Sequence, residues 1–206
     1  VLKAACRKLK AWENNARTAG LQLAINVSAR QFHQDDFVDQ VLSVVSAGKI
    51  RPGSLKLELT ESLILDNIDS AVDKMNALKD AGLRFSMDDF GTGYSSLSYL
   101  TQLPLHQLKI DQSFVHKMHD KPVNAVIVQT IIGMAENLDI EVIAEGVETA
   151  EQFRFLKDHG CPLFQGYHFG KPVAEDDFEQ LLDSIAKALQ PTSKASLADD
   201  VSYSDD

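Results

Sequence analysis

Short apolar segments alternate with longer amphipathic segments along this 206-residue chain, and this alternation constrains the fold more than any other feature. The short segments are rich in Leu, β-branched or aromatic residues and are bounded by turn or charged residues, which is typical of strands. The longer segments carry apolar residues at three- and four-residue steps, which is typical of helices packed on a core. The predicted strands are 21–28, 55–60, 83–88, 107–111, 141–145 and 163–169, and the predicted helices are 1–19, 36–47, 68–81, 123–138, 150–159 and 178–189.

A glycine follows four of the predicted helices, at Gly20, Gly48, Gly82 and Gly160, where a left-handed residue commonly ends a helix. Helix, glycine and strand in repeated order predict an α/β fold with a parallel sheet. Both an open doubly wound sheet and a TIM-barrel-like (β/α) barrel fit this order, and polar residues at nearly every strand end favour the barrel. About six of the eight strands of such a barrel are present, so we expect the others upstream of Val1.

The composition narrows the classes of partner. A net charge of −10 argues against a broad phosphate-binding surface, so we expect no DNA binding. Cys6 and Cys161 have neither metal spacing nor a disulfide framework, which indicates a reducing, cytoplasmic location. No apolar run approaches the roughly 20 residues of a membrane span, so we expect no membrane contact by this segment. We expect one domain over 1–189 and a disordered acidic tail over 190–206.

Acidic residues lie at the ends of several predicted strands, and in a barrel these ends share one mouth. Glu58, Asp88, Asp89 and Glu145 cannot all stay ionised together without cations. An all-oxygen ligand set favours Mg²⁺ or Mn²⁺, and the adjacent aspartates suit two ions about 3.5–4 Å apart, as in two-metal phosphoester hydrolysis. We expect Lys109 to orient the attacking water or to stabilise the transition state.

Alternatives remain open at this point. A single acidic residue at a strand end is more often a cap or a solvated turn residue than a ligand. Carboxylates with a lysine base would also suit an enolase-like metalloenzyme. Two glycines, Gly91 and Gly93, follow Asp88 and Asp89 and predict a tight loop that acts as a lid or a dimer contact.

The sequence contains six motifs in a characteristic order: NVS (26–28), LELTES (57–62), DDFGTGYSS (88–96), LKID (108–111), AEGVET (144–149) and QGY (165–167). Together they resemble the EAL-domain family of cyclic di-GMP phosphodiesterases. The resemblance implies a modified TIM barrel that hydrolyses cyclic di-GMP to linear pGpG with two Mg²⁺ or Mn²⁺ ions, and we expect inhibition by Ca²⁺, which polarises water less well. It also implies a homodimer formed through the loop and a neighbouring helix, and sensory or GGDEF domains in the parent protein.

The resemblance also implies roles for single residues. The implied metal ligands are Asn26, Glu58, Asp88, Asp89 and Glu145, and the implied catalytic residues are Lys109, Glu145 and Asp88, with Lys109 contacting the catalytic water. Glu61 is expected to anchor the loop that begins at Asp89. The residues expected to support the ligand or this loop are Glu61, Asp111, Glu148, Gln165, Gly91, Thr92 and Gly93.

One family motif does not occur in the sequence. The eponymous Glu-Ala-Leu, with an Arg two residues on, is expected upstream of Val1. We therefore expect little activity from the 206-residue chain alone and hydrolysis from a chain extended upstream. The second interpretation is a catalytically inactive cyclic di-GMP receptor or dimerisation module of the same fold.

Overall fold

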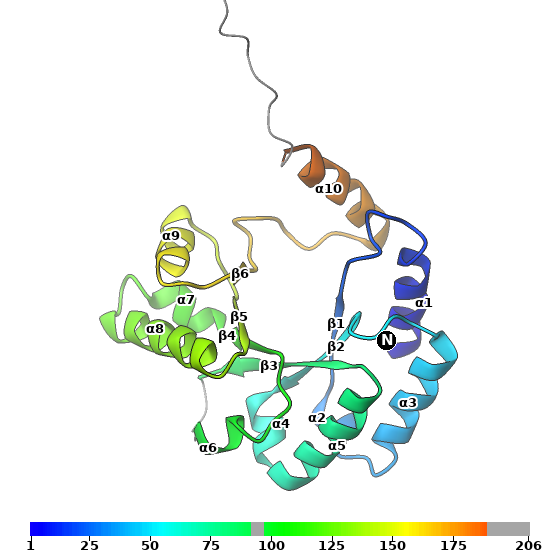
Figure 1. Ribbon diagram of the computed structural model, residues 1–206. Helices are drawn as coiled ribbons and strands as arrows, with labels where there is room; N and C mark the ends of the chain where they lie inside the picture. Colours follow the sequence, from blue (N-terminus) through cyan, green and yellow to red (C-terminus); the bar gives the residue numbers. More distant parts are fainter. Residues whose placement is uncertain (92–96, 189–206) are drawn as a thin grey trace, which may run out of the picture. The chain divides into compact units, whose positions relative to one another are not determined.

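The computed structural model describes residues 1–91 and 97–188, and Figure 1 shows their arrangement. The chain divides into two compact units, Val1–Gly170 and Lys171–Asp206. The first unit holds all six strands that the structure describes. The described part of the second unit forms the helix α10 (Glu175–Ala188), while the predicted tail at 190–206 lies outside the described residues.

Six parallel strands form the sheet of the first unit, and their order in the sheet is their order in the chain (Figure 1). A doubly wound sheet reverses its strand order at a switch point, so this sheet is the singly wound, barrel-type alternative. The predicted parallel α/β half-barrel is confirmed. The strands are β1 (Leu23–Asn26), β2 (Leu55–Thr60), β3 (Arg84–Phe90), β4 (Gln107–Ile110), β5 (Glu141–Ala144) and β6 (Leu163–Phe164).

Helices connect successive strands. The long helices lie close to where the sequence places them, but four helices of only four to six residues were not predicted, because so short a segment shows no helical periodicity. No helix among the described residues is long and apolar enough to cross a membrane. The helices of the first unit are α1 (Leu2–Trp12), α2 (Ala29–Phe32), α3 (Phe37–Gly48), α4 (Glu61–Leu65), α5 (Ile68–Asp80), α6 (Leu97–Leu100), α7 (Gln112–Lys117), α8 (Pro122–Asn137) and α9 (Ala150–Asp158).

The two faces of the sheet differ in chemistry because side chains alternate along each strand. One face is apolar and buried, and its residues include Leu57, Leu59, Phe85, Met87 and Leu108. The other face, here called the polar face, carries Lys56, Glu58, Ser86, Asp88, Gln107 and Lys109. The apolar face packs in the core with buried residues of the helices, such as Met75 and Leu78 of α5.

Several predicted boundaries were wrong. The first helix ends at Trp12 rather than at residue 19, and β6 ends at Phe164. Gly82 and Gly160 have the expected left-handed φ, at +86° and +87°. Gly20 does not, since no helix reaches it, and Gly48 lies inside α3, which is instead followed by a left-handed Lys49.

Candidate active site

A lysine and three carboxylates meet where β2, β3, β4 and β5 end. The Nζ of Lys109 lies 3.1 Å from Oε2 of Glu58, 3.0 Å from Oδ1 of Asp88 and 2.7 Å from Oε1 of Glu145. All four side chains are 7% to 17% exposed. The sheet brings them together because parallel strands place their carboxyl ends at one edge. We call these four residues the Lys109 cluster.

The electrostatics of the Lys109 cluster are dominated by burial and by mutual charge. Burial alone would lower the pKa of Lys109, but a hydrogen bond to Glu145 and the charges of Glu145, Glu58 and Asp88 raise this pKa well above its usual value. Burial raises the pKa of Glu145, and nearby Asp88 and Glu58 add to the rise, which the lowering by Lys109 does not cancel. Lys109 therefore stays protonated while the carboxylates around it are crowded.

A β-bulge lets two adjacent aspartates approach the same site. Residues next to each other in a regular strand face opposite ways, but the pairing of β3 with β4 shifts between Met87 and Phe90, and Asp89 adopts a left-handed φ of +55°. The pKa of Asp89 is raised by burial, by the charges of Asp88 and Asp111 and by a side-chain hydrogen bond with Asp111. Asp89 thus lies with Asp111 at the edge of the Lys109 cluster.

Asp111 has a second, local role. It precedes α7, and its Oδ1 accepts a hydrogen bond from the backbone N–H of Ser113 at 2.9 Å. This cap holds the first turn of α7 directly after β4. Asp111 therefore ties the position of α7 to the strand that carries Lys109.

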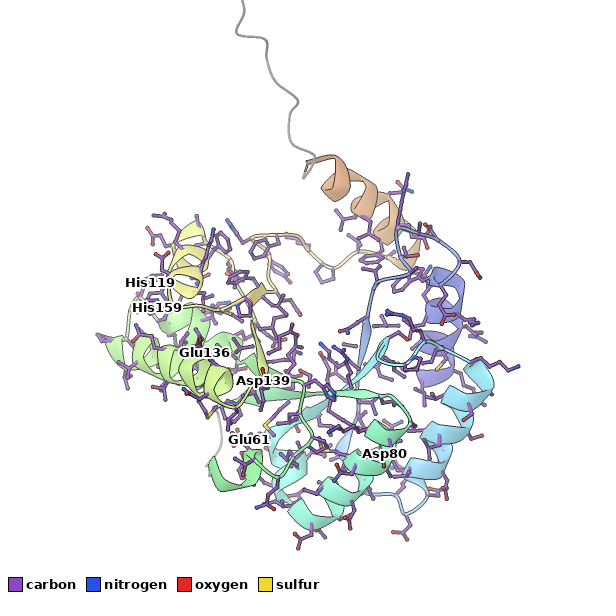
Figure 2. The ribbon with its side chains drawn as sticks, in the orientation of Figure 1. Glu61, Asp80, His119, Glu136, Asp139 and His159 are labelled. Carbon is purple, nitrogen blue, oxygen red and sulfur yellow. The ribbon has the colours of Figure 1, made fainter. Side chains whose placement is uncertain are left out.

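Glu61 is buried at the start of α4 and binds both sides of the segment that follows β3. Its carboxylate accepts hydrogen bonds from the N–H of Gly91 at 3.3 Å and from the hydroxyl of Tyr99 at 3.1 Å. Figure 2 shows Glu61 near α6, the helix that contains Tyr99. Thr92 and Gly93 lie outside the described residues. Tyr99 was not among the residues expected from the sequence.

Three more of the expected site residues lie at or shortly after strand ends. Asn26 ends β1 in register with Glu58 of β2, is exposed and lines a cavity of about 330 Å³ beside α3. Glu148 lies 3.7 Å from Nε2 of His116. The backbone of Gln165 follows β6 and bonds to Ala144 and Val147.

The histidines of α9 and its surroundings lie apart from this cluster. His119 and His159 both contact the ring of Phe155, with centroid distances of 6.1 and 4.2 Å. Figure 2 shows both on the outer side of α9. Both are exposed residues that pack on Phe155.

A layer of polar residues beneath the Lys109 cluster was not predicted from the sequence. Lys56, Ser86 and Gln107 each lie two residues before a residue of the cluster on the same strand, and all three are buried. The signal that could have found them is the two-residue period of a strand, applied backwards from Glu58, Asp88 and Lys109.

The donor set fits hard divalent cations. Asn26, Glu58, Asp88, Asp89 and Glu145 offer oxygen ligands. Burial, with a smaller contribution from neighbouring carboxylates, raises the pKa of Asp89 and of Glu145. Within the part of the chain that the structure describes, no three His, Cys, Asp or Glu side chains are grouped closely enough to hold one metal ion. The ammonium of Lys109 instead gathers three of the carboxylates.

The fold and site define a class, a parallel TIM-barrel-like half-barrel with an acidic cluster at the carboxyl ends of its strands. The chain belongs to the EAL domain family, whose model matches residues 1–172. All six motifs that carry the resemblance lie within the matched residues.

Three proteins illustrate the similarity. The chain is 39% identical over 182 residues to "Cyclic di-GMP phosphodiesterase NbdA" of Pseudomonas aeruginosa, which covers 88% of this chain and 23% of NbdA. It resembles the "PaMucR Phosphodiesterase, c-di-GMP complex" with a TM-score of 0.83 and 37% identity, over 86% of this chain and 71% of that chain. It resembles the "Klebsiella pneumoniae BlrP1 pH 9.0 manganese/cy-diGMP complex" with a TM-score of 0.71 and 33% identity, over 83% of this chain and 44% of that chain. The chain spans only 21% to 27% of the length of five curated relatives that it matches.

Proposed function

We propose that this chain belongs to a domain that hydrolyses cyclic di-GMP to linear pGpG with two Mg²⁺ or Mn²⁺ ions, and that the 206-residue chain alone has little of this activity. The observation that carries the proposal is the convergence of Glu58, Asp88 and Glu145 on Lys109 at the carboxyl ends of four strands. Relatives support the substrate, since NbdA is named for this activity and the MucR and BlrP1 structures are complexes with this nucleotide.

The residues that would hold the ions are Asn26, Glu58, Asp88, Asp89 and Glu145. The ions, when bound, supply Lewis acids that lower the pKa of a water molecule and neutralise charge on a phosphate oxygen. The BlrP1 structure is a manganese complex, which supports this choice of ion. We propose that Ca²⁺ inhibits, because it accepts longer and looser coordination.

Lys109 acts as a cation and donor rather than as a base. Its raised pKa keeps the ammonium protonated, and an ammonium has three N–H donors. Glu58, Asp88 and Glu145 occupy all three in this arrangement. Lys109 therefore reaches a water molecule or a phosphate oxygen only when at least one carboxylate turns away, which a competing cation would cause.

The test is hydrolysis followed by liquid chromatography of cyclic di-GMP and pGpG. The 206-residue chain and a version extended upstream of Val1 are assayed with Mg²⁺, Mn²⁺ or Ca²⁺. We expect the extended protein to form pGpG with Mg²⁺ or Mn²⁺ and not with Ca²⁺, and the shorter chain to form little. Binding of cyclic di-GMP without any turnover in either form would favour the receptor alternative.

Asp88 provides the residue-level check. Asp88→Asn removes a charged ligand and should abolish metal-dependent turnover, whereas Asp80→Asn on α5 makes the same chemical change away from the site (Figure 2). Turnover of Asp88→Asn at the wild-type rate would remove Asp88 from the metal site.

We propose further that two copies associate through α8. Val123 and Val126 are 61% and 58% exposed, and residues three apart share one side of a helix.

Location in the cytoplasm is also part of the proposal, supported by two free, buried cysteines, Cys6 and Cys161. MucR, named a bifunctional diguanylate cyclase and phosphodiesterase, supports a GGDEF partner domain in the parent protein.

A further inference from the structure

A buried amide joins four strands one layer beneath the Lys109 cluster. Oε1 of Gln107 on β4 accepts hydrogen bonds from Nζ of Lys56 on β2, at 3.0 Å, and from the hydroxyl of Ser86 on β3, at 3.2 Å. Nε2 of Gln107 donates to Oε2 of Glu141 on β5, at 2.7 Å. We call Lys56, Ser86, Gln107 and Glu141 the Gln107 network.

The hydrogen bonds fix which way the amide of Gln107 points. Lys56 can only donate, so its partner on Gln107 must be the oxygen. An ionised Glu141 can only accept, so its partner must be the NH₂ group. The amide oxygen of Gln107 therefore faces hydrogen-bond donors, and its NH₂ group faces an acceptor. A 180° flip of the amide would lose these hydrogen bonds.

The Gln107 network is costly as a packing device. Lys56 is 7% exposed, and burial lowers its pKa despite the nearby charges of Glu141 and Glu58. A buried ion or amide is often replaceable by apolar residues with no loss of stability. The network therefore needs a reason other than filling space.

The positions of these residues along their strands indicate such a reason. Lys56, Ser86 and Gln107 lie two residues before Glu58, Asp88 and Lys109, on the same face of the same strands. β4 has only four residues, so a lateral shift at Gln107 is carried to Lys109. Misplacement of reacting groups by about 1 Å can cost roughly 100-fold in rate.

We propose that the Gln107 network is a positioning device that sets the spacing of β2, β3, β4 and β5 and so the geometry of the Lys109 cluster. This inference rests on the proposed function. Gln107 is a positioning residue and touches neither the nucleotide nor the ions.

The test exchanges the donor and the acceptor between two strands. Gln107→Glu keeps an oxygen for Lys56 and Ser86 but replaces the donor to Glu141 with a second carboxylate. Adding Glu141→Gln returns an amide that donates to the new carboxylate, so the double variant restores the network in reversed polarity. Glu136→Gln on α8 is the matched control for the change at Glu141, since Glu136 is exposed and lies outside both groups (Figure 2).

Four quantities are measured in the protein form used for hydrolysis: the Mn²⁺ dissociation constant by calorimetry, kcat, KM and Tm. We expect Gln107→Glu to weaken Mn²⁺ binding or to lower kcat roughly 10- to 100-fold, as changes around metal ligands do, with little change in KM. We expect the double variant to regain most of the loss and Glu136→Gln to match wild type.

Two results would overturn the inference. One is a Gln107→Glu variant with a lower Tm but unchanged Mn²⁺ affinity and kcat. This result would show that Gln107 contributes only to stability. The other is a double variant no better than the single one. If Gln107→Glu does not fold, Ser86→Ala removes one bond to Oε1 without adding charge, and it should weaken Mn²⁺ binding in the same direction; no change there also overturns it.

Failure of the proposed function looks different. In that case wild type itself neither binds Mn²⁺ nor hydrolyses cyclic di-GMP, and both proposals fall. A wild-type protein that does both, beside a Gln107→Glu variant that equals it, overturns the network alone.

Discussion

At the residue scale, the site depends on groups that are unfavourable in isolation. Asp89 has a left-handed backbone and a crowded carboxylate, and Lys56 buries a charge. Such features persist where the surrounding structure holds them in place, and they concentrate at functional sites. Here both lie within one or two residues of the Lys109 cluster.

Asp89→Asn should stabilise the metal-free protein near neutral pH. A raised carboxyl pKa means that the folded state binds more protons than the unfolded state, so stability falls as pH rises from the ordinary value, about 4, through the raised value. Asn removes this penalty and tolerates a left-handed φ. Although part of the Asp89 carboxylate is shielded from water, the residue is largely exposed, so solvent screening keeps the gain in Tm small.

The measurement is thermal unfolding of both proteins in chelator between about pH 4 and about pH 8. The difference in Tm should grow with pH, and added Mn²⁺ should favour wild type, which keeps the ligand. A difference that is constant with pH would show that charge at Asp89 is not its cause.

At the scale of elements, the sequence predicts the strands and long helices because their apolar periodicity is set by which face is buried. The end of the first helix at Trp12 and the short α4 and α7 escaped prediction, since tertiary contacts rather than periodicity decide them. The acidic strand ends were predictable from their spacing. The bulge that re-aims Asp89 and the network around Gln107 were not, because pairing between strands creates both.

Gly146→Ala should disturb the turn that follows Glu145. Gly146 has a φ of +66°, and an added Cβ would lie 2.6 Å from Cβ of Gln112 and 2.8 Å from Nε2 of His116. The left-handed conformation alone costs an L-residue about 1–2 kcal/mol, and the contact with α7 adds to this. The Mn²⁺ affinity should fall as well, since the end of β5 carries Glu145.

Gly133→Ala is the matched control on α8. An added Cβ there meets nothing within 4 Å, so the helix should gain up to about 1 kcal/mol from the loss of glycine. Denaturant unfolding of both variants checks the pair. Equal stability of the two would contradict the packing described around Gly146.

At the scale of the whole molecule, the polar face of the sheet distinguishes this protein from barrels whose interior is filled by apolar side chains. The helices bury the other face, and the carboxyl ends of β2 to β5 carry the acidic groups. Stability and chemistry thus depend on different faces of the same strands. The chain also exposes an apolar stretch on α8, at Val123 and Val126.

Val126→Asp should abolish the proposed dimer. A charge in the middle of an apolar interface is left without a partner, which costs several kcal/mol. Asn137→Asp, at the other end of α8, adds the same charge outside the exposed pair and should leave the dimer intact. Light scattering after size-exclusion chromatography measures both, and a wild-type protein that is monomeric at all concentrations would contradict the proposal.

The most direct test is a crystal structure of the protein with Mn²⁺, using anomalous scattering to locate the ions. We expect two peaks held by oxygens of Glu58, Asp88, Asp89 and Glu145, with Asn26 at their edge and Lys109 released from at least one carboxylate. A map without anomalous density at these strand ends, with Lys109 still bound to all three carboxylates at saturating Mn²⁺, would contradict the proposed metal site.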